Sequence, residues 1–184
     1  GKAAAHITGY VGPITAEELK EAPEGIYNDN DLIGKVGLEK MYEDTLRGER
    51  GAKITLTIPA EEEGQQDEEI VVAEKEAKNG KRVQLSLDIN IQETMYEAYE
   101  KEDVAGTAAA VHPTTGEILA LISSPGYDPN ELTFGITQSR WDSLMDDPRE
   151  PFTNRFTSLY APGSVIKPLT AAIGLTEGSI THDE

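Results

Sequence analysis

The sequence has no cysteine, few basic residues and no long apolar run. Because cysteine is absent, the chain can form no disulfide, no thiolate metal site and no cysteine nucleophile. Its 16 Lys and Arg stand against 34 Asp and Glu, and the resulting net charge of −18 argues against nucleic acid as a partner. No stretch approaches the ~20 apolar residues that cross a bilayer. The 184 residues suffice for one ordinary domain or two small ones.

Both ends of the chain suggest that it is part of a longer protein. The chain does not begin with Met, and its first residues lack the charged-then-apolar pattern of a secretory signal. Its last residues follow directly after an apolar, helix-like segment. We therefore expect the chain to be a piece of a longer protein, and such a piece can carry an incomplete functional site.

Two helices are predicted in the first 50 residues. Thr15 and Glu18 have the spacing of a capping box, which predicts a short helix that continues through Lys20. Apolar residues at helical spacing, followed by Gly48, predict an amphipathic helix over residues 34–48.

The next 40 residues alternate between polar and apolar in the manner of strands. Period-two alternation predicts a strand over 52–59 with one buried face, which pairs with a second strand over 70–76. The acidic segment 61–69 between them is typical of a solvated loop. A turn at 78–81 and a further strand over 82–87 are expected to follow.

A helix over residues 90–102 is predicted next, with Asp88 as its N-cap. Its periodicity places four residues on the inward face: Ile91, Met95, Ala98 and Tyr99.

The second half of the chain contains the clearest hairpin signal. The runs 106–112 and 117–123 are apolar on both faces and flank a Pro-Thr-Thr-Gly turn at 113–116, so other layers are expected to cover both sides of this sheet. Further helices are predicted near 138–145 and, as a buried apolar helix, over 165–175.

Metal and cofactor sites are not predicted. The histidines at 6, 112 and 182 lie too far apart in sequence for a zinc motif. Residues 28–31 resemble the start of a calcium loop, but Ile33 stands where an oxygen ligand belongs, so a turn is the better interpretation. The acidic residues between 61 and 69 are typical of a solvated face.

One pair of residues could carry chemistry, Ser164 and Lys167. With 8 serines and 10 lysines, chance alone gives roughly 0.4 Ser-x-x-Lys pairs, so the pair by itself is weak evidence. Here it follows Pro-Gly and opens the apolar run, which places Ser164 at a helix N-terminus and Lys167 one turn later. A buried, neutral lysine can take the serine proton, and the helix N-terminus favours the neutral amine and supplies N–H groups to an oxyanion.

Pro168 removes one early helical N–H, so a slightly irregular backbone is expected next to Ser164. A purely structural alternative stays open at this point: Ser164 as a plain N-cap and Lys167 as an exposed helical residue.

Residues 162–171, PGSVIKPLTA, resemble the active-serine segment of class B penicillin-binding proteins, the D,D-transpeptidases that cross-link peptidoglycan. Four further blocks resemble that family in the same order: 6–14, 33–42, 84–88 and 112–130. In detail they look most like the low-affinity type of Gram-positive bacteria, the group that includes the methicillin-resistance transpeptidase.

The resemblance implies an α+β fold. Residues 1–81 would form a non-penicillin-binding, dimerisation-type module. Residues 82–184 would form the incomplete start of a serine transpeptidase or β-lactamase-like domain, an antiparallel sheet flanked by helices.

The resemblance also implies Ser164 as the acylated nucleophile and Lys167 as its proton acceptor, without cofactor or metal. D-Ala-D-Ala stem peptides and β-lactams would be the ligands, and cell-wall synthesis or division proteins the partners. The protein would reside on the extracellular face of a Gram-positive membrane, held only through an anchor that this chain lacks.

Two motifs of that family, Ser-x-Asn and Lys-Thr/Ser-Gly, do not occur in this sequence. We therefore expect the chain alone to be inactive. A β-lactam sensor and a non-catalytic cell-wall scaffold module are the alternatives to a transpeptidase.

Overall fold

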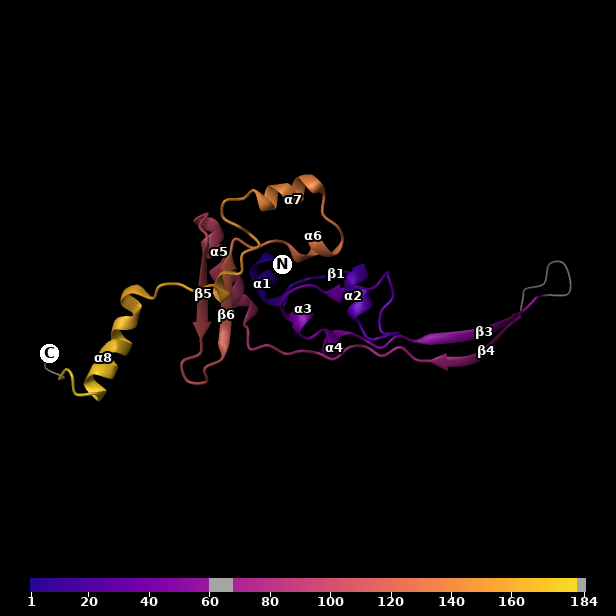
Figure 1. Cartoon of the computed structure of the whole chain (residues 1–184), viewed down its shortest axis with the longest axis horizontal. Coiled ribbons are helices and arrows are strands. Elements are labelled where there is room, and N and C mark those ends of the chain that lie inside the picture. The colour runs from indigo at the N-terminus through magenta and orange to yellow at the C-terminus, as the bar shows by residue number, and fades with distance from the viewer. Residues whose placement is uncertain (60–67, 182–184) are drawn as a thin grey trace.

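The computed structural model describes residues 1–59 and 68–181. In this part of the chain there are three two-stranded antiparallel sheets, joined and flanked by helices of 3 to 13 residues. Figure 1 shows a central body, a long hairpin that projects from one side, and a C-terminal helix that stands away from the other.

The N-terminal part is a chain of very short elements. They are η1 (Lys2–Ala4), α1 (Ala5–Thr8), β1 (Val11–Pro13), α2 (Ala16–Glu21), β2 (Leu32–Gly34), α3 (Gly37–Met41) and α4 (Glu43–Leu46), with β1 and β2 paired antiparallel. The predicted capping box is confirmed, because Glu18 N–H donates to Thr15 Oγ1 at 3.2 Å and Thr15 N–H to Glu18 Oε2 at 2.8 Å.

The single helix predicted over 34–48 is wrong, since it is two short helices with a break at Tyr42. Just after the break, the Glu43 carboxylate accepts the Gly34 N–H at 2.7 Å and the Tyr27 hydroxyl at 2.8 Å. Gly34 belongs to β2, so a continuous helix from residue 34 would lose both the strand and these contacts.

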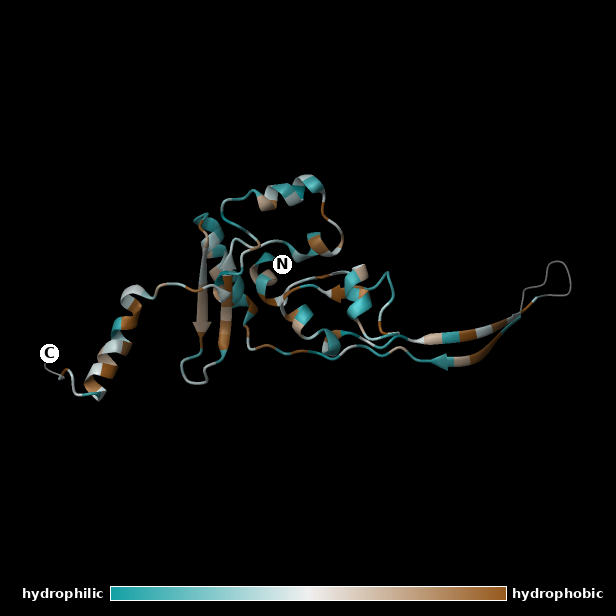
Figure 2. Ribbon diagram, viewed as in Figure 1, coloured by the Kyte–Doolittle hydropathy of each residue, from teal (hydrophilic) through white to brown (hydrophobic). Residues whose placement is uncertain are grey.

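The projecting hairpin pairs β3 (Ala52–Ile58) with β4 (Glu68–Lys75), which confirms the predicted pairing. The expected buried face is wrong: every residue of both strands is exposed, and Ile54, Leu56 and Ile58 are 63%, 53% and 42% accessible. Nothing in the described part of the chain lies over them, and Figure 2 shows hydrophobic residues along this hairpin. Most of the predicted acidic loop over 61–69 lies outside the described residues, and its last two residues belong to β4.

The turn predicted at 78–81 and the strand predicted over 82–87 are also wrong. The segment is extended, and Lys78 forms an isolated antiparallel bridge with Glu49, with N–H to O distances of 2.8 and 2.9 Å. Among the described residues, two hydrogen bonds join the end of this segment to a strand, from the Ser86 hydroxyl to the Ile118 carbonyl and from the Asp88 N–H to the Leu119 carbonyl of β6, and these do not make a strand ladder over 82–87.

The body is built on α5 (Ile89–Lys101) and the hairpin of β5 (Gly106–Val111) and β6 (Ile118–Ser124). This hairpin and the Asp88 cap were both predicted, and the Asp88 side chain accepts the N–H groups of Asn90 and Ile91. From Ala120 to its end, β6 is buried except for the half-buried Leu121, whereas Val111 in β5 is exposed. The expectation that other layers cover both strands of the hairpin therefore holds only for β6.

The inward face of α5 differs from the prediction. Its buried residues are Gln92 and Tyr96, whereas Ala98 is exposed and Ile91, Met95 and Tyr99 are half-buried. The shift has a polar cause: the Gln92 amide hydrogen-bonds the outer edge of β6, with Nε2 to Leu121 O and Leu121 N to Oε1 both at 2.8 Å.

The N-terminal segment packs on this body. Ala5 is fully buried, its carbonyl accepts the Tyr127 hydroxyl at 3.3 Å, and the Ala3 carbonyl accepts Gln92 Nε2 at 2.6 Å. His6 stacks edge-on against Tyr127 with the ring centroids 5.2 Å apart. Residues at the very start of the chain therefore belong to the core that forms after residue 88.

The rest of the chain contains α6 (Pro129–Thr133), α7 (Gln138–Met145), η2 (Arg155–Thr157), η3 (Gly163–Ile166) and α8 (Lys167–Thr176). α7 has the predicted bounds, and α6, which Asp128 caps, was not predicted. No residue of α8 is buried, and within it Gly174 and Leu175 alone are half-buried, so the expected burial of this helix is wrong for the described part of the chain. None of the described helices has the length and apolar character that a membrane span requires.

Candidate active-serine segment

Ser164 lies in η3, one turn of 3₁₀ helix directly before α8. Pro162 precedes the turn, and Gly163 has φ of +55°, a left-handed conformation that is costly for any residue with a side chain. Pro168 has no N–H for the Ser164 carbonyl, which instead accepts the Lys167 N–H in an i to i+3 bond. The irregular backbone expected beside Pro168 is therefore present as this 3₁₀ turn.

The 3₁₀ geometry also sets the direction of the two candidate side chains. In a 3₁₀ turn, residues three apart in sequence stand one above the other, so Ser164 and Lys167 share one edge of the segment. Both residues are exposed, and neither side chain has a hydrogen bond or ion pair within the described part of the chain. The turn thus supplies a nucleophile and a nearby amine, but not the low-dielectric surroundings that would favour a neutral amine.

The opposite edge of the segment is apolar. Val165, Leu169 and Ile173 recur every four residues and are 81%, 61% and 63% accessible. In Figure 2 the C-terminal helix α8 carries brown hydrophobic bands between paler and teal ones.

The chain that leads to Ser164 is fastened to β6 by Ser123, a residue that the sequence analysis missed. The Ser123 hydroxyl is buried, donates to the Thr153 carbonyl at 3.0 Å and accepts the Arg155 N–H at 3.1 Å. The only sequence signal for it is a pair of serines at the end of an apolar strand.

The Arg155 side chain, at the first position of η2, binds the loop over 149–153 that precedes it. Its guanidinium donates to the carbonyls of Glu150, Thr153 and Arg149. In the same loop Arg149 binds Asp147, and these bonds lower the pKa of the Asp147 carboxyl to about 2.

The histidines have structural roles where they are described. His112 accepts the Thr115 N–H at its Nδ1 and so stabilises the β5–β6 turn. His6 lies in the cluster with Tyr127, where burial lowers its pKa, although the Pro125 and Pro151 carbonyls oppose the shift. His182 lies outside the described residues.

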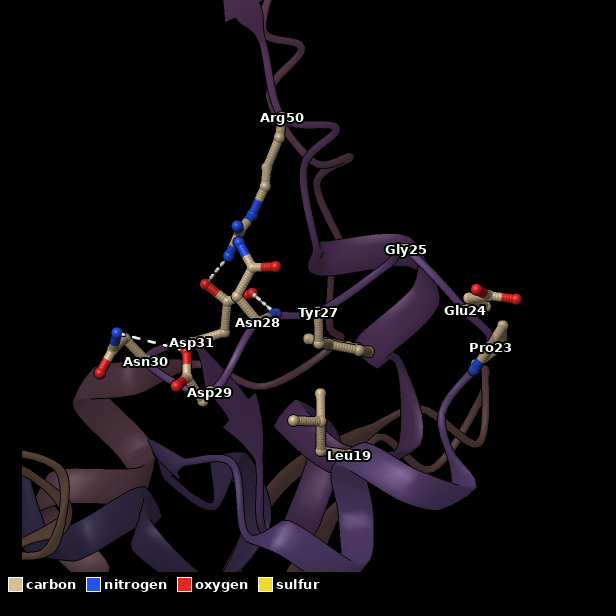
Figure 3. A pocket seen from close by; sticks show the side chains of 10 residues that line it. All are labelled: Leu19, Pro23, Glu24, Gly25, Tyr27, Asn28, Asp29, Asn30, Asp31 and Arg50. Carbon is tan, nitrogen blue, oxygen red and sulfur yellow. Dashed lines mark hydrogen bonds and ion pairs between the residues drawn. The ribbon is translucent and has the colours of Figure 1, made fainter.

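A separate hollow of about 690 Å³ lies between α2 and residues 23–31 (Figure 3). The predicted turn is confirmed there, because Asp31 N–H donates to the Asn28 carbonyl. The Asp31 carboxylate is occupied by the Asn28 N–H and by Arg50. Among the described residues, no three His, Asp or Glu side chains are arranged to hold a metal ion.

Both halves of the chain match models of known protein families. Residues 1–85 match the family model of the penicillin-binding protein dimerisation domain, and residues 106–184 match that of the penicillin-binding protein transpeptidase domain. The chain belongs to the class B penicillin-binding proteins. The predicted fold class, a dimerisation-type module followed by the start of a transpeptidase domain, is confirmed.

Individual penicillin-binding proteins resemble the chain over nearly its whole length. It is 47% identical to penicillin-binding protein 3 of Bacillus subtilis, covering 100% of this chain and 26% of that protein. It is 37% identical to the peptidoglycan D,D-transpeptidase MrdA of Acinetobacter baumannii, covering 96% and 25%. The chain thus spans about a quarter of these relatives.

Solved penicillin-binding proteins share the fold. The structure of Pseudomonas aeruginosa PBP2 in complex with WCK 5153 superposes with a TM-score of 0.77 at 33% identity, over 98% of this chain and 35% of that one. Helicobacter pylori PBP2, in its complex with MreC, gives 0.77 at 32% identity, over 95% and 32%.

Proposed function

We propose that the whole protein is a peptidoglycan D,D-transpeptidase with Ser164 as its nucleophile and Lys167 as its proton acceptor. The observation that carries the proposal is the placement of the two residues on one edge of the η3–α8 segment, within the stretch that matches the transpeptidase domain model. The names of the relatives support the reaction.

The proposed first step forms an acyl-enzyme. Ser164 Oγ bonds to the carbonyl carbon of the penultimate D-Ala of a stem peptide while neutral Lys167 Nζ takes the hydroxyl proton. The tetrahedral centre collapses, the bond to the terminal D-Ala nitrogen breaks, and that nitrogen leaves with the proton. N–H groups at the start of the η3–α8 segment would stabilise the oxyanion.

In the second step an amine of a neighbouring strand attacks the acyl carbon and Ser164 Oγ takes its proton back. A β-lactam would acylate the same hydroxyl by ring opening, without a leaving group that departs. The chemistry needs no metal or cofactor.

The finer assignments belong to the same proposal. Residues 1–81 would be the dimerisation-type module and residues 82–184 the start of the transpeptidase domain. The low-affinity Gram-positive type is favoured by the 47% identity to the Bacillus protein. The protein would act at the extracellular face of the membrane, and the solved PBP2–MreC complex supports a cell-wall synthesis protein as partner.

A labelled penicillin tests the proposal on the whole protein. We expect one adduct, on Ser164, that is lost in Ser164→Ala and slowed at least a hundredfold in Lys167→Met. Ser179→Ala is the matched control, because that serine lies beyond the other end of α8 and should label normally. A label on another residue, or undiminished labelling of Ser164→Ala, would refute it. Labelling without any cross-linking activity would indicate the sensor instead.

A further inference from the structure

We infer that Ser123 is a positioning residue for Ser164: its hydroxyl ties the chain that carries the nucleophile to strand β6. This inference rests on the proposed function, because it concerns the reactivity of Ser164. It arises from a buried hydroxyl whose two hydrogen bonds both go to one segment, residues 153–155.

The Ser123 hydroxyl binds one backbone carbonyl and one backbone N–H of the same segment. Ser123 is 2% accessible, and its Oγ donates to the Thr153 carbonyl while accepting the Arg155 N–H, at 3.0 and 3.1 Å. Both backbone groups would be left without these partners if the hydroxyl were removed, which is the costly case for partly buried polar groups. β6 is paired with β5 on its other side, so the anchor point is itself rigidly held.

The segment is organised on both sides of the anchor. Upstream, the Arg155 guanidinium binds three carbonyls of the loop over 149–153. Downstream, the hydroxyls of Thr157 and Ser158 both donate to the Asn154 carbonyl, at 2.9 and 3.3 Å. The organised backbone thus extends from the β6 anchor to Ser158.

Only residues 159–162 separate this organised stretch from the turn that holds Ser164. Four residues span at most ~14 Å, so the anchor restricts Ser164 to a small region around β6. If the Ser123 bonds are lost, the side-chain bonds within residues 149–158 still hold that stretch together, but it loses this hydrogen-bonded attachment to β6. The nearest residue upstream with a packed ring is then Phe152, which lies against Tyr127 and Trp141, so the whole stretch that leads to Ser164 can shift relative to β6.

Positioning of this kind acts on the rate of the chemical step. Displacement of a reacting group by about 1 Å can cost on the order of 100-fold in rate. In the whole protein we therefore expect Ser123→Ala to lower the acylation rate constant at saturating labelled penicillin by about 10-fold to 100-fold. The pre-acylation binding constant and the final labelled fraction should stay at wild-type values.

Two variants make the test specific. Ser123→Thr retains the hydroxyl and should recover most of the rate. Ser86→Ala is the matched control, because the Ser86 hydroxyl also binds β6, at the Ile118 carbonyl 2.7 Å away, but does not touch residues 153–155. Ser86→Ala should acylate at the wild-type rate.

Hydrogen exchange of the Arg155 and Ser158 N–H groups, which are bonded to Ser123 Oγ and to the Arg155 carbonyl, gives a second readout that needs no enzymatic reaction. It should accelerate in Ser123→Ala and not in Ser86→Ala. Wild-type exchange, equal slowing of acylation in the two alanine variants, or a labelled fraction that falls with the fraction of folded protein would each overturn the inference. If the wild-type protein is not labelled at Ser164 at all, the proposed function fails instead, and with it the positioning role, even where the exchange result holds.

Discussion

Replacement of Gln92 by leucine should destabilise the protein more than any other single amide substitution on α5 or α7. The Gln92 side chain is 1% accessible and makes three hydrogen bonds, to the Leu121 N–H, the Leu121 carbonyl and the Ala3 carbonyl. Gln92→Leu keeps the approximate size and leaves these three groups without the amide. A half-buried polar group that loses its hydrogen-bond partner destabilises the folded state by about 1–3 kcal/mol, and a carbonyl lies toward the lower end of this range.

The three groups together cost about 3–6 kcal/mol, and burial of the more apolar leucine offsets about 1–2 kcal/mol. We expect a net loss of about 1–5 kcal/mol in the free energy of unfolding. Urea titration of the 184-residue chain can measure it through the fluorescence of Trp141, its single tryptophan, which packs on Phe152 in the same body.

Gln138→Leu is the matched control. That amide is exposed and binds only Asp142, so the same substitution should change the free energy of unfolding by less than about 0.5 kcal/mol. If Gln92→Leu and Gln138→Leu unfold at the same urea concentration, the amide does not hold the N-terminal segment to β6, and the reasoning is refuted.

Gln92→Glu adds a test with a defined sign. The introduced carboxyl group would face the carbonyls of Ala3 and Leu121, so burial and these oxygens should raise its pKa above the unfolded value of about 4.3. A raised folded-state pKa gives stability that is present below the unfolded pKa and is lost as pH rises through the folded pKa. Relative to wild type at equal pH, Gln92→Glu should be least stable above neutrality and should recover toward pH 4.

Three further predictions concern other groups. Arg149→Gln should return the pKa of Asp147 from about 2 toward its ordinary value of 3.8, as followed by carboxyl NMR, and an unchanged titration would refute the pairing. Burial holds the pKa of the His6 imidazole below 6.5, so the unfolded chain binds a proton at His6 more readily than the folded chain does. The free energy of unfolding should therefore fall as pH drops below about 6.5, and His6→Phe should flatten this pH dependence. Gly163→Ala should slow acylation of Ser164 in the whole protein by several-fold, because φ of +55° costs about 1–2 kcal/mol with a side chain, whereas Gly25→Ala, at φ of +77° and far from η3, should not.

The features that could be predicted from the sequence are those decided within a few residues. The Thr15–Glu18 capping box, the Asp88 cap, the β5–β6 turn and the bounds of α7 each depend on neighbours along the chain. The side-by-side placement of Ser164 and Lys167 is of the same kind, because a spacing of three on one turn fixes it. The irregular backbone at η3 could likewise be predicted, because Pro168 lacks an N–H.

The features that could not be predicted depend on partners far away in sequence. Gln92 is polar and periodicity gives it no preference for the interior, yet it is buried because Leu121, 29 residues later, offers an unpaired N–H and carbonyl at the strand edge. Ser123 is matched to Thr153 and Arg155, 30 and 32 residues away. The alternation in β3 correctly marks an apolar face, but a face alone does not say what covers it.

The Ser164 segment shows why an apolar pattern and an active site make separate demands. From the 3₁₀ turn into α8, Val165, Leu169 and Ile173 fall on one side of the axis, while Ser164 and Lys167 fall on the other. A surface that covered only the apolar side would remove hydrophobic area from water and leave the amine solvated. The proposed activation of Ser164 by a neutral amine would therefore need a second surface on the opposite side, one that excludes water from Lys167 while leaving room for a peptide.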